Sequence, residues 1–340
     1  MGSRIGVLGT GSYLPKEETS NEEVAARVGV TAEWIERKTQ IASRRYAAPD
    51  EATSDLAARA AEAALEQCGL AAHDVDYLIV ATSTGDFPQP PTSYLVQDLI
   101  GARRAACLDI NVVCSGFVFA LAAARGMLAQ NPGSIALVIG ADLYSRILDF
   151  TDRRTAVLFA DGAGAAVVGE VPEPYGIVDM DLTSRGAAHG LIRVEAGGSR
   201  RPASALTLAE GGHFFRMDGR AVRDFVSEHV PPALARLVER CGLGLDQVGH
   251  FVPHQANGVM LDDVVKRAGL AGALTHRTLR TSGNVGSASV PLALDEANRT
   301  GALADGDLVL LAGFGGGMSI GTALLRWGPA RAREPAPLCR

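Results

Sequence analysis

The sequence of 340 residues has few lysines and few cysteines, and it has no long basic or apolar segment. Lysine supplies only three of its 32 basic residues, none of them in a Lys/Arg-rich run, and the net charge is −6. An acidic chain of this kind is a poor nucleic-acid binder. The cysteines are odd in number, widely spaced and without a C-x-x-C pair, so neither a disulfide framework nor a zinc site is indicated. They are Cys68, Cys107, Cys114, Cys241 and Cys339.

Membrane and export signals are missing as well. The longest uncharged apolar run, residues 110–124, is shorter than the ~20 residues that span a bilayer. The N-terminus has no charged-then-apolar signal pattern, and Gly6 does not fit a myristoylation motif. We therefore expect a reduced, water-soluble protein of the cytoplasm that binds neither membranes nor nucleic acid.

The sequence does contain an internal repeat with an offset of 173 residues. Four separate segments match at this one offset without a gap. Chance identity can explain any single match, but four matches in register favour duplication. The matches are EQCGL at 66–70 with ERCGL at 239–243, Asn111 with Asn284, Leu121 with Leu294, and Gly140 with Gly313.

Each half is predicted to contain a helix, a strand, a second helix without a polar face, and further strands. Ser54 is a plausible cap for the first helix and Gly69 a plausible stop. Strands that alternate with helices predict mostly parallel sheets covered on both faces. The predicted fold class is therefore α/β, with five α-β-α-β-α layers made of two duplicated halves. The predicted elements are helices 54–67, 114–130, 222–240 and 287–298 and strands 76–82, 135–139, 163–168, 248–253, 308–312 and 320–326.

The two halves are assigned to residues 1–170 and 216–327, and we expect them to share one core and one active site. Residues 171–215 between them are rich in glycine and proline, and we expect an irregular connection that caps a pocket. The tail, residues 328–340, contains three prolines and is expected to be disordered.

Cys114 stands where a predicted strand ends and the apolar helix of the first half begins. A thiol at a helix N-terminus experiences the positive end of the helix dipole, which favours the nucleophilic thiolate. A free cysteine is also often a small buried apolar residue and nothing more. Taken alone, Cys114 leaves both interpretations open.

His254 follows the strand 248–253, and Asn284 precedes the apolar helix of the second half. By the offset, the Asn284 loop is equivalent to the Cys114 loop. Because ligands bind at the edge where such strands end, the repeat predicts that Cys114, His254 and Asn284 converge near the centre of the molecule. His and Asn side chains beside a thiol can hold a carbonyl oxygen or stabilise an enolate. The alternative is that they only satisfy buried polar groups.

Two glycine-rich segments have several possible functions. Residues 6–11 (GVLGTG) suggest a dinucleotide fingerprint, but its third glycine would fall on Leu14, and Pro15 would stop the required helix, so we reject this interpretation. Residues 313–317 (GFGGG) lack the Lys-Ser/Thr of a phosphate-binding loop. They form either a crowded turn or a loop whose N–H groups point at a developing oxyanion.

Four motifs occur in order along the chain: NVVCSGF at 111–117, PHQAN at 253–257, SGNVGSASVPLAL at 282–294 and GFGGG at 313–317. Together they closely resemble the β-ketoacyl-acyl-carrier-protein synthase III family. The resemblance extends from Ile5 to Trp327, nearly the whole chain. It implies the thiolase fold, which agrees with the repeat, and a homodimer.

The resemblance also implies a decarboxylative condensation. Cys114 would be acylated by an acyl-CoA, with its own N–H and an N–H from residues 315–317 as the oxyanion hole. A malonyl thioester, on acyl carrier protein or on CoA, would then lose CO₂ while His254 and Asn284 hold its carbonyl oxygen. The carbanion would attack the acyl group and prime fatty-acid, polyketide or specialised-metabolite synthesis. The implied reaction needs no metal and no redox cofactor. Acyl-CoA takes part as a substrate and not as a cofactor.

Further binding residues follow from the resemblance. Trp34 and Arg153 match the pair that stacks on the CoA adenine, and Asn257 matches a residue that supports this region. Phe87 resembles the phenylalanine that reaches across the dimer to close the partner's acyl pocket, and Tyr144 is a second candidate for the pocket wall. The alternatives are core aromatics for Trp34 and Phe87 and a solvated charge for Arg153.

Three positions depart from the family pattern. Arg223 and Asp224 stand where the family usually has an aromatic and a basic residue, and Val259 stands where an arginine is common. Those basic positions help to dock an acidic carrier protein, which an acidic residue repels at short range. Whether the acceptor is bound to a carrier, bound to CoA or untethered is therefore left open.

The alternative function is a related acyltransferase that moves the acyl group from Cys114 to an alcohol or amine without decarboxylation. Asn284 argues against it, because a simple transfer needs a general base instead. A catalytically silent acyl-binding subunit is disfavoured by the intact Cys/His/Asn set. A 3-hydroxy-3-methylglutaryl-CoA synthase relative is disfavoured because no acidic general base is evident near the cysteine motif.

Overall fold

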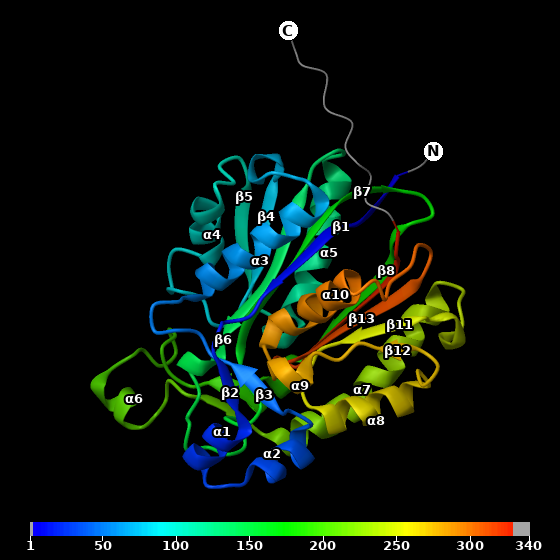
Figure 1. Cartoon of the computed structure of the whole chain (residues 1–340). Helices are drawn as coiled ribbons and strands as arrows, with labels where there is room; N and C mark the ends of the chain where they lie inside the picture. Colours follow the sequence, from blue (N-terminus) through cyan, green and yellow to red (C-terminus); the bar gives the residue numbers. More distant parts are fainter. Residues whose placement is uncertain (1–2, 329–340) are drawn as a thin grey trace.

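Two five-stranded sheets lie at the centre of the protein (Figure 1). The computed structural model describes residues 3–328. The strand order is β1-β7-β6-β4-β5 in the first sheet and β8-β14-β13-β11-β12 in the second. The first sheet contains β1 (Ser3–Tyr13), β4 (Tyr77–Ala81), β5 (Ala106–Ile110), β6 (Ala136–Leu143) and β7 (Asp161–Pro172). The second contains β8 (Gly176–Ser184), β11 (His250–Pro253), β12 (Leu274–Thr275), β13 (Leu308–Gly315) and β14 (Ser319–Arg326).

Helices cover the outer faces of both sheets and fill the space between them (Figure 1). α3 and α4 pack on the first sheet, α5 and α10 lie between the sheets, and α7 and α8 pack on the second. This arrangement confirms the five predicted α-β-α-β-α layers. The helices are α3 (Thr53–Cys68), α4 (Thr92–Ile100), α5 (Gly116–Gln130), α7 (Gly219–Arg240), α8 (Gly258–Ala268) and α10 (Ser289–Arg299).

The central helix α5 is apolar on nearly all sides. Within residues 3–328, Val113–Gln130 is the one helical stretch long and apolar enough to cross a membrane. Its apolar side chains contact strands of both sheets, so they belong to the protein core.

The sequence repeat is visible in three dimensions. β1 and β8 begin at residues 3 and 176, β4 and β11 at 77 and 250, and α5 and α10 at 116 and 289, so each pair is 173 residues apart. The two sheets also have the same order of equivalent strands. The predicted duplication is therefore confirmed.

The prediction of mostly parallel sheets is confirmed for four strands of each sheet, which run in the same direction, and is wrong for the fifth, β7 in the first sheet and β14 in the second. β4 pairs in parallel with β5 and β6, whereas β7 is antiparallel to both β6 and β1. The second sheet repeats this pattern. No α-helix lies between β6 and β7 or between β13 and β14, and a chain that turns back directly pairs antiparallel.

The predicted irregular connection over 171–215 is wrong in part, because Gly176–Ser184 forms β8 at the edge of the second sheet. Asp179 and Asp181 interrupt the apolar residues of this strand, which hides it in the sequence. The rest of the connection holds β9 (Ile192–Val194), α6 (Ala205–Ala209) and β10 (Phe215–Met217). The predicted disordered tail lies, apart from Gly328, outside the described residues.

Both ends of α3, the first helix of the repeat, are capped. Gly69 ends α3 in the left-handed conformation at φ 68°, as predicted. Ser54 is not the N-cap, which is Ala52. The Asp55 carboxylate accepts the N–H of Ala52, while the Ser54 hydroxyl donates to Asp86. A carboxylate in the first turn therefore replaces the expected hydroxyl cap.

The glycines of residues 6–11 serve packing. The whole segment lies inside β1, which confirms the rejection of a dinucleotide site. A Cβ on Gly11 would lie 2.3 Å from the backbone nitrogen of Ala64, so only glycine lets α3 pack this closely on the strand.

The smaller elements are β2 (Glu18–Ser20), α1 (Asn21–Val28), α2 (Ala32–Thr39), β3 (Ser43–Arg45) and α9 (Leu279–Ser282).

Candidate active site

Cys114 lies in a one-turn helix, Val113–Ser115, that joins β5 to α5. Val113 has a φ of 47°, a left-handed conformation that is rare for a β-branched residue. Backbone strain of this kind clusters at functional sites, where the surrounding structure maintains it. The turn places Cys114 at the N-terminal end of α5, with only 4% of the residue exposed.

Cys114, His254 and Asn284 line one cavity of about 210 Å³. They come from the turn before α5, the residue after β11 and the loop between α9 and α10. The starts of α5 and α10 meet beside this cavity, since a Cβ on Gly116 would lie 3.4 Å from the Cβ of Ser287. The structure therefore brings together the three residues that the repeat predicts to converge.

His254 is buried and held by Ser289, the first residue of α10. Its Nδ1 lies 2.6 Å from the Ser289 hydroxyl oxygen, which also lies 2.9 Å from the Gly286 carbonyl oxygen. The single hydroxyl proton can be donated to only one of them. Holding a substrate carbonyl requires a hydrogen on Nε2 of the histidine, and this tautomer requires Ser289 to donate to Nδ1. Burial lowers the pKa of His254 to about 3, so its ring is neutral at physiological pH.

Replacing Ser289 with alanine is expected to slow condensation about tenfold, because the His254 tautomer loses its hydrogen-bond donor. Acylation of Cys114 should stay within about twofold, because that step does not need a hydrogen on Nε2. Intact mass measures the acyl-enzyme, and CO₂ release measures condensation. Ser282→Ala is the matched control, because Ser282 is also buried but donates to the Thr278 carbonyl. Equal effects of the two substitutions would show a structural role only.

Asn284 is fixed through its backbone and its amide oxygen. Its backbone N–H donates to the Leu158 carbonyl, its own carbonyl accepts from Ala160, and Oδ1 accepts the Gly286 N–H at 3.0 Å. No hydrogen bond from Nδ2 to another group is found within residues 3–328, although the residue lines the cavity. Both N–H groups of the amide are therefore available to an oxygen in the cavity.

The Cys114 thiol has a pKa well above the ordinary value for cysteine. Burial and, to a smaller extent, the Asp142 carboxylate raise its pKa to about 12, although a hydrogen bond with the Tyr144 hydroxyl opposes the shift. The expectation of a thiolate at the helix N-terminus is therefore wrong for the unliganded protein, because burial outweighs the helix dipole. All four described cysteines are free.

A buried carboxylate lies two hydroxyl groups away from the nucleophile. The Tyr144 hydroxyl lies 3.1 Å from the Ser83 hydroxyl, which donates to Asp142 at 2.9 Å. The other carboxylate oxygen of Asp142 accepts from the backbone and the hydroxyl of Ser287. Asp142 is therefore an anchor between the two halves, and the sequence indicates none of these contacts.

The rate of Cys114 alkylation by iodoacetamide is expected to rise about tenfold per pH unit from roughly pH 7 to pH 9.5 without a plateau. The pKa of the thiol is raised to about 12, so the thiol is still largely protonated over this whole range and its small thiolate fraction grows with each pH unit. Mass spectrometry of the Cys114 peptide measures the rate, with glutathione as the freely ionising control. A plateau near pH 8 would show that the helix dipole dominates over burial.

Of the three glycines proposed for the oxyanion hole, Gly315 is the one in contact with the nucleophile. A Cβ there would lie 2.7 Å from the Cβ and 3.2 Å from the sulfur of Cys114. Gly316 lies against Val113, and a Cβ on Gly317 would meet only the first residue of β14. A side chain at position 315 would therefore displace the nucleophile.

The predicted CoA and acyl-chain residues differ in their position around the cavity. Asn257 lines it, caps α8 and donates to a backbone carbonyl of α2. Tyr144 is buried next to the cavity. Its ring packs against that of Phe159, which lines the cavity. Trp34 is half-buried on α2, Arg153 is exposed, and Phe87 is 58% exposed after β4. None of these last three lines the cavity of the single chain.

Two side chains of the site, Ser289 and Phe314, are not predicted from the sequence. Ser289 is equivalent by the offset to Gly116 at the start of α5, but the offset does not place its hydroxyl beside His254. Phe314, whose ring centre lies 5.3 Å from that of His254, stands inside the glycine-rich segment and is the largest residue there. A Tyr144 contact with Cys114 has no sequence signal, because it depends on the path of residues 143–147 between β6 and β7.

The fold and the Cys/His/Asn cavity define an acyl-transferring enzyme with the thiolase fold. Residues 108–186 match the family model described as 3-oxoacyl-[acyl-carrier-protein (ACP)] synthase III, and residues 238–327 match its C-terminal counterpart. The chain therefore belongs to the 3-oxoacyl-[acyl-carrier-protein] synthase III family.

Individual relatives agree with this assignment. The acetoacetyl CoA synthase NphT7 of Streptomyces sp. (strain CL190) is 50% identical over 95% of this chain and 99% of its own length. The β-ketoacyl-[acyl-carrier-protein] synthase III of Symbiobacterium thermophilum is 42% identical over 95% and 98%. The structure of the priming β-ketosynthase from the R1128 polyketide biosynthetic pathway is 35% identical with a TM-score of 0.88, over 96% of this chain and 97% of that one.

Proposed function

We propose that Cys114 accepts an acyl group from an acyl-CoA and that the acyl-enzyme condenses with a malonyl thioester. In the first step the Cys114 sulfur attacks the thioester carbonyl, its proton leaves with the thiol of CoA, and the thioester bond moves to the enzyme. The cysteine N–H and the backbone beside Gly315 are the proposed oxyanion hole. The observation that supports this assignment is the convergence of Cys114, His254 and Asn284 in one cavity.

In the second step the malonyl thioester loses CO₂, and the electrons of the broken bond form an enolate. Nε2 of His254 and Nδ2 of Asn284 donate hydrogen bonds to its oxygen. The enolate carbon then attacks the acyl carbonyl, the bond to Cys114 breaks, and a β-ketoacyl thioester is released. The alternative acyltransferase is not favoured, because His254 is neutral, buried and placed with an amide donor rather than with a carboxylate base.

The wall behind the nucleophile favours a short acyl group. The rings of Tyr144 and Phe159 lie 4.5 Å apart, and both pack against Phe215 at 5.4 and 4.7 Å. All three are at most 3% exposed, so the cluster is a wall shielded from solvent. An acetyl group fits beside Cys114 without moving this cluster, whereas a long chain must displace it.

The acceptor is a malonyl thioester on acyl carrier protein or on CoA. One relative is named as an acetoacetyl CoA synthase and another as a β-ketoacyl-[acyl-carrier-protein] synthase III, so names that refer to CoA and to acyl carrier protein both occur among similar proteins. We propose that the reaction primes fatty-acid or polyketide synthesis in the cytoplasm and needs no cofactor. Within residues 3–328, no group of three or more His, Cys, Asp and Glu residues is placed to hold a metal ion.

A panel of acyl-CoAs tests the function. Intact mass is measured after mixing the protein with acetyl-, butyryl-, hexanoyl- and decanoyl-CoA, and CO₂ release is followed after malonyl-CoA or malonyl carrier protein is added. We expect fastest labelling by acetyl-CoA and CO₂ release that depends on the acyl-enzyme. Labelling without CO₂ from either acceptor would favour the acyltransferase, and no labelling at all would exclude both.

We further propose a homodimer joined at the free edge of the first sheet. β5 is the edge strand, and the exposed side chains of Phe87, Tyr94 and Leu99 lie on the neighbouring loop and on α4. An open strand edge beside exposed apolar side chains favours pairing with a second copy. Light scattering on the full chain measures the mass, and a monomer at micromolar concentration would contradict this proposal.

A further inference from the structure

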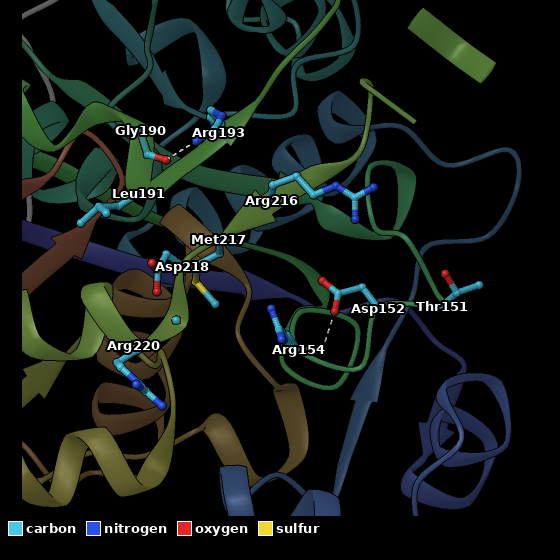
Figure 2. Close-up of a pocket in the computed structure, with 11 residues that line it drawn as sticks. Thr151, Asp152, Arg154, Gly190, Leu191, Arg193, Arg216, Met217, Asp218 and Arg220 are labelled. Atoms are coloured by element: carbon cyan, nitrogen blue, oxygen red, sulfur yellow. Dashed lines mark hydrogen bonds between the residues drawn. The ribbon is translucent and has the colours of Figure 1, made fainter. Parts of the chain in front are cut away.

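A second and larger cleft, of about 1080 Å³, lies next to the Cys114 cavity. Figure 2 shows the residues that line this cleft. Arg154, Met217 and Gly219 line both spaces, so the cleft borders the path to the nucleophile. It is formed by residues 151–154, the segment 190–193 and the start of α7. The family motifs in the sequence give this cleft no function.

The cleft has an excess of positive charge. Four arginines line it, against two aspartates. Arg193 and Arg216 each pair with a nearby carboxylate, at 2.8 and 3.1 Å. The side chains of Arg154 and Arg220 form no ion pair and no hydrogen bond within residues 3–328. Figure 2 shows these two side chains on different walls of the cleft, Arg154 on the 151–154 loop and Arg220 on α7.

The two aspartates that line the cleft are engaged elsewhere. Asp218 caps α7 by accepting the N–H of Ala221 at 3.1 Å. Asp152 accepts the backbone N–H of Arg154 and the hydroxyl of Thr155, both at 3.0 Å. The N-terminus of the 22-residue helix α7 opens on the same cleft and adds its positive pole. Unpaired guanidinium groups at a helix N-terminus are well suited to phosphate.

The outer surface that the family uses for an acidic carrier has little free positive charge here. Arg223 pairs with its neighbour Asp224 at 2.8 Å, and Val259 is 50% exposed where an arginine is common. The last turn of α8 carries two more basic residues, Lys266 and Arg267. Arg267 forms an ion pair with Asp263 of the same helix, whereas Lys266 forms none within residues 3–328. In the described part of the chain, Arg154 and Arg220 are therefore exposed, unpaired basic residues that line the cleft, and Arg153 is a further unpaired arginine next to Arg154 in the sequence.

We propose that the Arg154–Arg220 cleft binds the phosphate groups of coenzyme A, so that malonyl-CoA is the acceptor in preference to a malonyl carrier protein. This inference rests on the proposed condensation. A recessed cleft of this volume accommodates a nucleotide with its phosphates, whereas a folded carrier protein contacts the outer surface. The shared residues Met217 and Gly219 allow the pantetheine arm to pass from the cleft to Cys114.

The test compares acceptors with and without phosphate in the full-length protein. For Arg154→Ala and Arg220→Ala, KM for malonyl-CoA should rise about tenfold each, because each substitution removes a charge-assisted hydrogen bond. The kcat should change by less than about twofold. All acceptors are added to enzyme that has first been fully acylated with excess acetyl-CoA, because the acyl donor carries the same phosphates. Malonyl-N-acetylcysteamine, which has no phosphate, should then react equally with all variants. Arg200→Ala is the matched control, because Arg200 is an exposed arginine between β9 and α6 that lines neither the cleft nor the Cys114 cavity.

The outcomes are distinct. Unchanged KM for malonyl-CoA in both variants would overturn the proposal, and so would an equal loss with malonyl-N-acetylcysteamine. A selective loss with malonyl carrier protein would overturn it in favour of carrier docking. CO₂ release from malonyl-N-acetylcysteamine by the unmodified protein tests the condensation itself, so a failure of the chemistry is separated from a failure of the cleft assignment. Lysine substitutions at 154 and 220 should recover part of the affinity.

Discussion

The Cys114→Ala protein is expected to show no acyl-enzyme at all after mixing with acetyl-CoA, and its condensation rate should fall by at least about 10⁴-fold. The cavity beside His254 and Asn284 contains no second nucleophile that could replace the sulfur. Intact mass before and after addition of acetyl-CoA measures the first effect, and CO₂ release from a malonyl thioester measures the second.

Cys107→Ala and Cys241→Ala are the matched controls. Both cysteines are free, and burial raises the pKa of both thiols, as it does for Cys114, but neither lines the cavity. Each control should become acylated at the unmodified rate. Labelling of the Cys114→Ala protein to the same extent as the original would refute the assignment of the nucleophile.

Asn284→Ala should separate the two half-reactions. Its acylation should stay within about threefold, while condensation should fall by about 10²- to 10³-fold, because the enolate loses a preorganised donor. The basis is geometric: Oδ1 is already occupied by the Gly286 N–H, so only Nδ2 faces the substrate. Pre-acylated enzyme mixed with a malonyl thioester in a single turnover measures the second step alone.

A second substitution at the same position distinguishes chemistry from packing. Asn284→Asp keeps the side-chain volume but removes the donor, and it should lose condensation at least as completely as alanine. Asn131→Ala, at the far end of α5, should leave both steps unchanged. Loss of acylation together with condensation in Asn284→Ala would show that this residue supports the fold of the loop instead.

The layers and the convergence of the site are predictable because both follow from the repeat. Once Asn284 is equivalent to Asn111, the loop before α10 has to lie opposite the loop before α5. Nothing more than the offset and the rule for strand ends is needed for this step. The identity of the three reacting side chains then follows from their residue types.

Features that depend on tertiary contacts are not predictable in this way. Ser54 has the residue type of a cap, but its hydroxyl donates to Asp86, which is distant in sequence, and Asp55 accepts the N–H of the actual N-cap residue, Ala52. The thiol at 114 has the local position of a thiolate, but its pKa depends on how completely the second half covers it. The tautomer of His254 depends on Ser289, which is distant in sequence and adjacent only after folding.

Duplication has a direct electrostatic consequence for this enzyme. The helices α5 and α10 occupy equivalent places in the two halves, and their first turns are in contact between the sheets. Each helix N-terminus is equivalent to about half a positive charge. A single half would point one such pole at the reaction centre, whereas the paired halves point two. The two halves together therefore direct two positive helix ends toward the region of Cys114 and Asn284, and the resulting field favours an anion there before any particular side chain is considered.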